Sequence, residues 1–208
     1  MSGLNVQMQI SIDGFVGSTI PGSTWQLWDW GPNWTWSADV KAHFNAFFDG
    51  VRGILLSRPM LAEGYLDHWQ RVADQHPDDP DYRFARRIGE VQKFVVSQHG
   101  VDASWPSTTV INAPLADGVL QAQTAAKGDV VCFGGAGFVN ALLQHDLVDE
   151  LQLYINPGVA GEGSRIFDRT MATENYQLVN ATSTKCGILI GRWTKRRQSQ
   201  AAEAGNAS

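Results

Sequence analysis

Little in this sequence points to a secreted or membrane-bound protein. Its 208 residues contain only two cysteines, Cys132 and Cys186. Each stands in an apolar segment that predicts a strand, so we interpret both as buried thiols of a reducing compartment and not as a disulfide framework. No apolar run approaches the ~20 residues of a membrane span, and the first residues show no signal-peptide pattern. We therefore expect a cytoplasmic protein without a membrane partner.

The chain also has little positive charge. It contains 16 Lys and Arg against 21 Asp and Glu, for a net charge of −5. No basic stripe is visible, which argues against nucleic acid as a partner, and we interpret the cluster 195–197 as part of a solvated tail. The five histidines show no metal-ligand spacing. The zinc deaminase signature, the G-x-S-x-G elbow and the Walker A loop are all absent. We predict no metal site.

The most informative segment that is present covers residues 130–143. A β-branched and aromatic run stops at Gly134 and Gly135, and an apolar pattern typical of a helix begins at once. Glycines at such a turn let the backbone approach a ligand, and the start of a helix offers N–H groups to an anion. A tight turn that needs glycine only for its geometry explains the pattern equally well. The third glycine and the later acid of a Rossmann fingerprint are missing, so another fold must hold any nucleotide bound here.

The order of elements predicts an α/β protein. We expect strands at 4–12, 51–56, 93–97, 108–111, 130–133 and 151–155, and a hairpin at 176–184 and 187–194. Helices are expected after Ser37 as N-cap, at 60–75, at 82–89, at 115–126, and from the glycine turn to about 145. Alternating strands and helices indicate a largely parallel sheet, with the hairpin at its edge. We predict one domain over residues 1–197 and a disordered tail over 198–208.

Residues 17–36 form a Trp-rich segment with no regular periodicity. It holds five indoles: Trp25, Trp28, Trp30, Trp34 and Trp36. An irregular segment of this length cannot bury all of them, so we expect some to line a cleft or to cover a neighbouring subunit. We therefore predict a homodimer in which this segment closes over the site or packs on the partner.

Five segments, taken in order, resemble the dihydrofolate-reductase-like family. Within it they look most like the reductase domain of the riboflavin-pathway deaminase–reductase and its stand-alone relatives. The segments cover residues 11–16, 55–58, 93–97, 133–137 and 147–167. The resemblance implies a central, mostly parallel sheet flanked by helices, with a C-terminal antiparallel hairpin. It also implies NADPH as cofactor and a small heterocyclic substrate.

The resemblance further implies where the cofactor lies. The glycine turn would cradle the pyrophosphate, Arg58 would meet the 2′-phosphate with its fork of donors, and residues 97–98 would lie beside the ribose. Relatives carry Gly-Arg-x-Thr where this chain has 57–60 as Ser-Arg-Pro-Met, so phosphate binding is expected to be weaker or to use another donor. The full expected set is Gly14, Ser57, Arg58, Ser97, Gln98, Gly134, Gly135, Ala136, Gly137 and Phe138.

Reduction of a heterocycle needs a group that polarises or protonates the bond receiving hydride. Asp39 is the first candidate, because folate-reducing relatives hold an acid at the start of this helix. The helix dipole alone would also favour an acid there. Asp13 is the second candidate, although Asp-Gly is an ordinary turn dipeptide. We expect the tryptophans around Asp39 to exclude water and raise its pKa. We interpret Asp149 and Glu150 as structural.

Three functions are compatible with these residues. The first, which the resemblance favours, is an NADPH-dependent reductase of a pterin-like or ribosylaminopyrimidine heterocycle. The second is a nucleotide- or flavin-binding homo-oligomer of the same fold that has lost catalysis. The third is an oligomer whose Trp-rich segment serves assembly alone. The sequence does not distinguish among the substrates, because fold resemblance does not identify a ligand.

Overall fold

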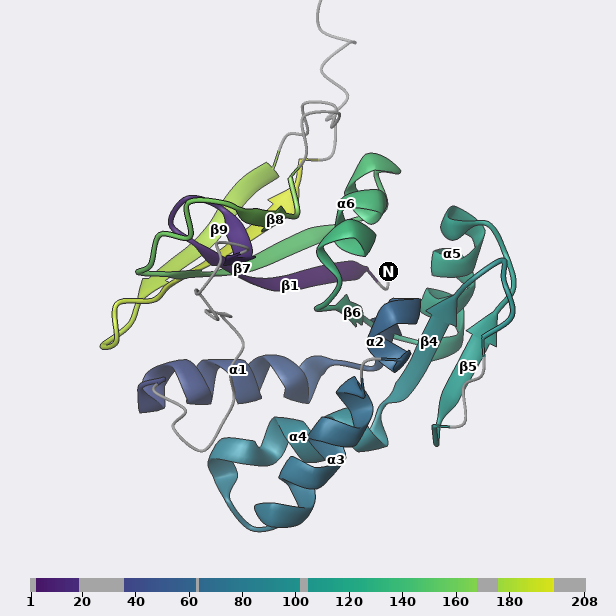
Figure 1. Cartoon of the computed structure of the whole chain (residues 1–208), viewed down its shortest axis with the longest axis horizontal. Coiled ribbons are helices and arrows are strands. Elements are labelled where there is room, and N and C mark those ends of the chain that lie inside the picture. Colours follow the sequence, from purple (N-terminus) through teal and green to yellow (C-terminus); the bar gives the residue numbers. More distant parts are fainter. Residues whose placement is uncertain (1–2, 19–35, 63, 102–104, 168–175, 197–208) are drawn as a thin grey trace, which may run out of the picture.

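The centre of the molecule is an eight-stranded sheet (Figure 1). The computed structural model describes residues 3–18, 36–62, 64–101, 105–167 and 176–196. The strand order is β5-β4-β3-β6-β1-β7-β10-β9. All pairs from β5 to β7 are parallel, whereas β10 runs antiparallel to both β7 and β9. The predicted parallel sheet with a C-terminal hairpin is thus confirmed. The strands are β1 (Leu4–Ser11), β3 (Gly53–Leu56), β4 (Gln92–Val96), β5 (Thr108–Ile111), β6 (Val130–Cys132), β7 (Glu150–Asn156), β9 (Tyr176–Ser183) and β10 (Leu189–Lys195).

A second, two-stranded sheet was not predicted. β2 (Phe15–Ser18) pairs antiparallel with β8 (Gly163–Arg165), and the Arg165 guanidinium lies 3.9 Å from the centre of the Phe15 ring. Strands this short carry too few residues for a periodic signal. β2 includes residues 17 and 18, which were expected to be irregular. Residues 19–35 lie outside the described residues.

Helices cover both faces of the large sheet (Figure 1). One face carries α1 (Ala38–Gly50), α3 (Tyr65–Gln75) and α4 (Arg83–Glu90), which follows the 3-10 turn η1 (Pro80–Tyr82); the other carries α5 (Leu115–Ala126) and α6 (Ala136–Gln144). The prediction of a single helix over 60–75 is wrong. The chain instead forms α2 (Arg58–Ala62) and then α3, because Gly64 adopts a left-handed conformation with φ of 72°. The two helices can therefore point in different directions.

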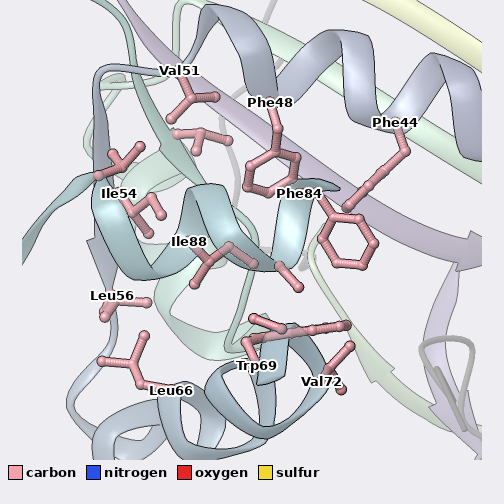
Figure 2. Close-up of a cluster of buried hydrophobic side chains, with 14 of the residues drawn as sticks. Phe44, Phe48, Val51, Ile54, Leu56, Leu66, Trp69, Val72, Phe84 and Ile88 are labelled. Atoms are coloured by element: carbon pink, nitrogen blue, oxygen red, sulfur yellow. The ribbon is translucent and has the colours of Figure 1, made fainter. Parts of the chain in front are cut away.

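The core under α1, α3 and α4 combines aromatic rings with aliphatic side chains (Figure 2). The rings of Phe44 and Phe84 meet edge to face at 5.0 Å, and those of Trp69 and Phe84 at 4.9 Å. Lys93 is also buried at this face, and its Nζ donates to three carbonyls at the end of α4, those of Ile88, Gly89 and Val91. Burial lowers the pKa of Lys93. Because every proton of the ammonium has an acceptor, this charge serves as a helix cap.

The core under α5 and α6 is aliphatic. Alternate residues of β1, Leu4, Val6, Met8 and Ile10, all pack into it. The residues between them face the other side. Gln7 and Gln9 are nevertheless buried there, with exposed fractions of 3% and 8%. A parallel strand covered on both faces is normally apolar throughout, so β1 departs from the pattern of its own sheet.

Two smaller expectations differ from the structure. Cys132 is buried in β6 as predicted, but Cys186 is only half-buried and lies in the turn between β9 and β10. Ser37 occupies the N-cap position of α1, yet its side chain makes no capping hydrogen bond. Among the described residues, no helix combines the length and apolar character that a membrane crossing requires.

Candidate functional site

The expected cofactor residues gather at one edge of the sheet. β4, β3, β6 and β1 are neighbours and run parallel, so their carboxyl ends lie side by side. Ser97 follows β4, Ser57 follows β3, Gly134 follows β6, and Gly14 lies in the turn after β1. In open α/β sheets, ligands bind in the crevice outside the carboxyl ends of the strands. The sheet thus brings together residues that are more than a hundred positions apart.

The glycine turn joins β6 to α6. Gly135 is the N-cap of α6 and has a φ of 70°, a conformation that a residue with a Cβ rarely adopts. A Cβ on Gly135 would also lie 3.0 Å from the Ser57 hydroxyl, and one on Gly134 would overlap Met60. A Cβ on Gly137 would meet nothing within 4 Å. Glycine is therefore required at 135 by backbone geometry, a Cβ on Gly134 needs the flexible end of Met60 to move, and open space for a ligand lies beside Gly137.

Ser57 is the residue at this edge with an unused polar atom. Its exposed fraction is 3%, and its Oγ has no hydrogen-bond partner among the described residues. A buried hydroxyl left unsatisfied costs about 1–3 kcal/mol. Ser57 replaces the glycine of the family pattern, and its hydroxyl lies against the turn that begins α6. Among the described residues, Ser57 Oγ is therefore an unused donor beside this turn.

The other cofactor candidates differ in their exposure and in whether their side chains already make hydrogen bonds. Arg58 opens α2 and is exposed. The Ser97 hydroxyl donates to the carbonyl of His99 and accepts from its backbone N–H, so it closes a local turn. Gln98 is exposed next to that turn, and Ala136 and Phe138 are half-buried in the first turn of α6. Of this group, Arg58 and Gln98 have side chains exposed to solvent.

A cavity of about 350 Å³ adjoins the glycine turn. This volume falls in the range of about 300–1,000 Å³ typical of small-molecule sites. Its walls are mainly aromatic, with Tyr65 and Phe133 at a ring distance of 5.5 Å. No carboxylate is among the described residues that line it, and its one positively charged residue, Arg71, is exposed. The lining residues are Gln7, Met8, Gln9, Val16, Phe44, Met60, Gly64, Tyr65, His68, Trp69, Arg71, Phe84, Ile88, Phe133, Gly134 and Gly135.

Two glutamines of β1 contribute polar atoms to this cavity. Gln7 Nε2 and Gln9 Oε1 are both buried, and within the described part of the chain neither has a hydrogen-bond partner. Each orphaned amide end costs about 1–3 kcal/mol unless a ligand satisfies it. Two such atoms two residues apart on one strand, facing an aromatic cavity, indicate a place where a polar ligand edge binds.

Asp39 does not have the environment that we expected. Its carboxylate accepts hydrogen bonds from the backbone N–H of Lys185, at 3.0 Å, and of Val40, at 3.1 Å. The Ser37 side chain and these amides lower the pKa of Asp39, so the expected rise in its pKa is wrong. Asp39 is exposed and does not line the cavity. Its observed contacts tie the start of α1 to the turn between β9 and β10.

Asp13 is likewise held by structural contacts. Its Oδ1 accepts from the Ser11 hydroxyl at 2.6 Å and from the Ala160 N–H at 3.0 Å, and its Oδ2 accepts from the Gly161 N–H at 2.8 Å. The Ser11 bond is the main reason that the pKa of Asp13 falls to about 2. An acid with this pKa is ionised near neutral pH. Asp13 fastens the loop after β7 to the end of β1.

Trp36 is the one tryptophan of the Trp-rich segment within the described residues. It is buried and stacks on Tyr154 at a ring distance of 5.5 Å, with an angle of 4° between the planes. The Tyr154 hydroxyl lies 3.1 Å from His43 Nδ1. Burial raises the pKa of Tyr154 and lowers that of His43. Trp36 therefore belongs to the core. The placement expected for the other four tryptophans lies outside the described residues.

Sequence reasoning missed the residues that form the cavity. Gln7 and Gln9 lie in the strand expected over 4–12, and Tyr65 and Trp69 in the helix expected over 60–75, but neither pattern indicated a site. His68 and Met60 carried no signal of a site. One clue was available. The first strand lies at the centre of this parallel sheet, and a strand in that position is covered on both faces, so its polar residues cannot be exposed to water. The described residues contain no group of three or more His, Cys, Asp or Glu that could hold a metal ion.

Comparison with known proteins shows the family and the fold of this chain. The family model of the RibD C-terminal domain matches residues 3–190. The chain is 24% identical over 187 residues to the uncharacterized protein YyaP of Bacillus subtilis (strain 168), covering 88% of this chain and 90% of YyaP.

Two solved structures share the fold at low identity. A proposed riboflavin biosynthesis protein of Shewanella sp. PV-4 matches with a TM-score of 0.64 and 17% identity, over 94% of this chain and 99% of that one. The diaminohydroxyphosphoribosylaminopyrimidine deaminase/5-amino-6-(5-phosphoribosylamino)uracil reductase of Thermotoga maritima matches with a TM-score of 0.61 and 10% identity, over 94% of this chain and 57% of that one. This chain therefore spans little more than half of the bifunctional protein.

Proposed function

The chain belongs to the RibD C-terminal domain family, a family of reductases, and from this premise we propose that it is an NADPH-dependent reductase of a flat heterocycle, either pterin-like or a ribosylaminopyrimidine. The observation that carries the proposal is one continuous site. A glycine turn with open space beside it, a buried unpartnered hydroxyl on Ser57 and an aromatic cavity of about 350 Å³ all adjoin at the carboxyl edge of the sheet. The space beside the glycine turn suits a dinucleotide, and the neighbouring cavity suits a ring substrate.

The residues at the edge fit the cofactor that the family uses. The N–H groups at the start of α6 suit a pyrophosphate, and the Ser57 hydroxyl supplies a further donor to it. Arg58 takes the 2′-phosphate, because an exposed guanidinium binds phosphate with two parallel hydrogen bonds. Gln98 and Ser97 lie beside the ribose, and Gly14 gives the nicotinamide end close access to β1. NADPH supplies hydride to the substrate.

The chain must also supply a proton to the atom next to the carbon that is reduced. His68 lines the cavity, and imidazole is the side chain whose charge changes most readily near neutral pH. We therefore propose His68 as the proton donor in place of Asp39 and Asp13. Asp39→Asn then changes stability alone, whereas His68→Gln lowers kcat at least tenfold and alters its pH profile. Loss of turnover in Asp39→Asn with normal activity in His68→Gln would restore the original assignment.

The cofactor proposal is tested at Arg58 and Gly137. Arg58→Ala should weaken NADPH binding by about 1.5–3 kcal/mol, as expected for a charged hydrogen bond, and leave NADH nearly unaffected. Gly137→Val places its side chain in open space, so it should block the cofactor without disturbing the fold. Gly135→Val is a poorer test, because strain and the Ser57 contact alone would perturb the turn. Binding is followed by quenching of the eight tryptophans. NADPH affinity unchanged in both variants would refute the cofactor site.

A non-catalytic nucleotide- or flavin-binding protein is the second candidate. It predicts that NADPH or a flavin binds but that no heterocycle supports oxidation of NADPH.

We further propose a homodimer. The outermost strand β9 is exposed along its length, and Leu178 and Val179 on it have exposed fractions of 51% and 48%. Sedimentation as a monomer at all concentrations would exclude the dimer.

A further inference from the structure

Two glutamines of β1 form the polar floor of the cavity. Gln7 and Gln9 point to the same face of the sheet, since alternate residues of a strand do so. Both are more than nine-tenths buried, and among the described residues Gln7 Nε2 and Gln9 Oε1 have no partner. One is a donor and the other an acceptor. A ligand that satisfies both must present an acceptor and an N–H or O–H donor on a single edge.

The spacing of the two side chains along β1 favours a ligand edge of similar length. Residues two apart on a strand are separated by about 6.6 Å, and their side chains leave the sheet roughly in parallel. Neighbouring polar groups on a single pyrimidine ring lie closer together than this. A fused two-ring heterocycle carries its donors and acceptors along a longer edge, and it can reach both amides while it lies flat.

The remaining walls are compatible with a flat, uncharged ring system. Tyr65, Trp69 and Phe133 supply aromatic surface, against which a planar ring packs well. Arg71 is the one positively charged lining residue and is exposed, and no carboxylate is among the described lining residues. Recognition of ring N–H groups therefore falls to the amides and not to an acid.

We infer that Gln7 and Gln9 are the specificity-determining residues of this site: Gln7 Nε2 donates to a ring acceptor, Gln9 Oε1 accepts from a ring N–H, and the substrate is a fused bicyclic heterocycle of the pterin type. The inference rests on the proposed function and decides between its two substrate classes. It concerns the ring and not the cofactor, because neither glutamine belongs to the glycine turn.

The test compares methionine variants, which keep the length of the side chain and remove the amide. Gln7→Met and Gln9→Met should each weaken binding of 7,8-dihydropterin at least tenfold, measured by calorimetry without NADPH. The matched control is Gln152→Met. Gln152 lies directly across from Gln7 on β7, is equally buried, and has an unpartnered Oε1, but it lines a separate cavity. Dihydropterin binding should be unchanged in this control, and thermal unfolding verifies that each variant is folded.

Substrate size is tested with 5,6-diaminouracil as the single-ring probe. Wild-type protein should bind dihydropterin at least tenfold more tightly than diaminouracil. Equal affinities, no measurable binding of dihydropterin, or full binding in the folded Gln7→Met and Gln9→Met variants would each overturn the inference. NADPH is titrated in parallel. If NADPH does not bind while dihydropterin binding depends on Gln7 and Gln9, the cofactor proposal fails and the inference stands.

Discussion

The two faces of β1 differ in what they bury. On the side of α5 and α6, Val6 and Met8 are packed among aliphatic residues. On the side of α1 and α3, Gln7 and Gln9 are as well buried but leave amide atoms unsatisfied. The same eight-residue strand therefore completes a core on one side and the floor of a cavity on the other.

The buried apolar side chains of β1 stabilise the fold, whereas its buried glutamines cost stability that the fold tolerates. Lys93 shows that the chain can satisfy a buried polar group at the same face, since its three Nζ contacts use all its donors. Gln7 and Gln9 have no such arrangement for their free ends. Natural proteins keep unsatisfied buried groups at sites where a ligand completes them. We therefore regard the glutamine face as functional and the aliphatic face as structural.

The largest expected effect comes from moving an amide to the aliphatic face. Val6→Gln would bury a polar group among side chains that cannot bond to it, where Val6 now has an exposed fraction of 0%. The free energy of unfolding should fall by about 3–5 kcal/mol. Urea denaturation measures the change. A loss below about 1 kcal/mol would show that the two faces are more alike than their packing indicates.

The opposite exchange should have a smaller effect of opposite sign. Gln7→Met removes an unsatisfied amide from the cavity and keeps the volume of the side chain, so the free energy of unfolding should rise by about 1 kcal/mol. A rise in stability together with loss of ring binding is the signature of a functional residue. Marked destabilisation by Gln7→Met would mean that the amide is part of the structural core.

The smallest expected effect concerns the end of β1, where Asp13 fastens the loop after β7. The pKa of Asp13 falls from an ordinary 3.8 to about 2 in the folded protein, so its contribution to stability is present above pH 3.8 and is lost as the pH falls through about 2. Asp13→Asn should be less stable than wild type near neutral pH, and the difference should shrink between pH 4 and 2. A difference that is constant over this interval would show that the charge is unimportant.

Much of the fold was predictable because its signals are local. The 3.6-residue pattern of α1, the β-branched run of β4 and the stop at Gly134 all depend on neighbours in the chain. The division of residues 60–75 into two helices was missed, since the left-handed conformation of Gly64 leaves no periodic trace. The short strands β2 and β8 were missed because each is stabilised mainly by pairing with the other.

Of the residues expected at the site, Gly134 and Gly135 line the cavity, whereas the role of Arg58 stays a prediction. Asp39 and Asp13 are acids in positions that also suit a helix start and a turn, and each accepts hydrogen bonds both from close neighbours and from backbone N–H groups far along the chain. The distant partners leave no mark in a local sequence pattern. The lowered pKa of Asp39 follows from the Ser37 side chain first and then from the Lys185 N–H, whereas the expected rise assumed that the acid lay behind tryptophans.

The sequence by itself determined the α/β order, the mostly parallel sheet and the glycine turn after β6, because strand and helix periods and glycine conformations are properties of short segments. Only the tertiary structure decided that Gln7 and Gln9 face a cavity and not water. Alternation along a strand specifies which residues share a face, but what covers that face depends on α1, α3 and α4, which come later in the chain. Whether this polar face forms a site therefore depends on packing between distant segments of the chain.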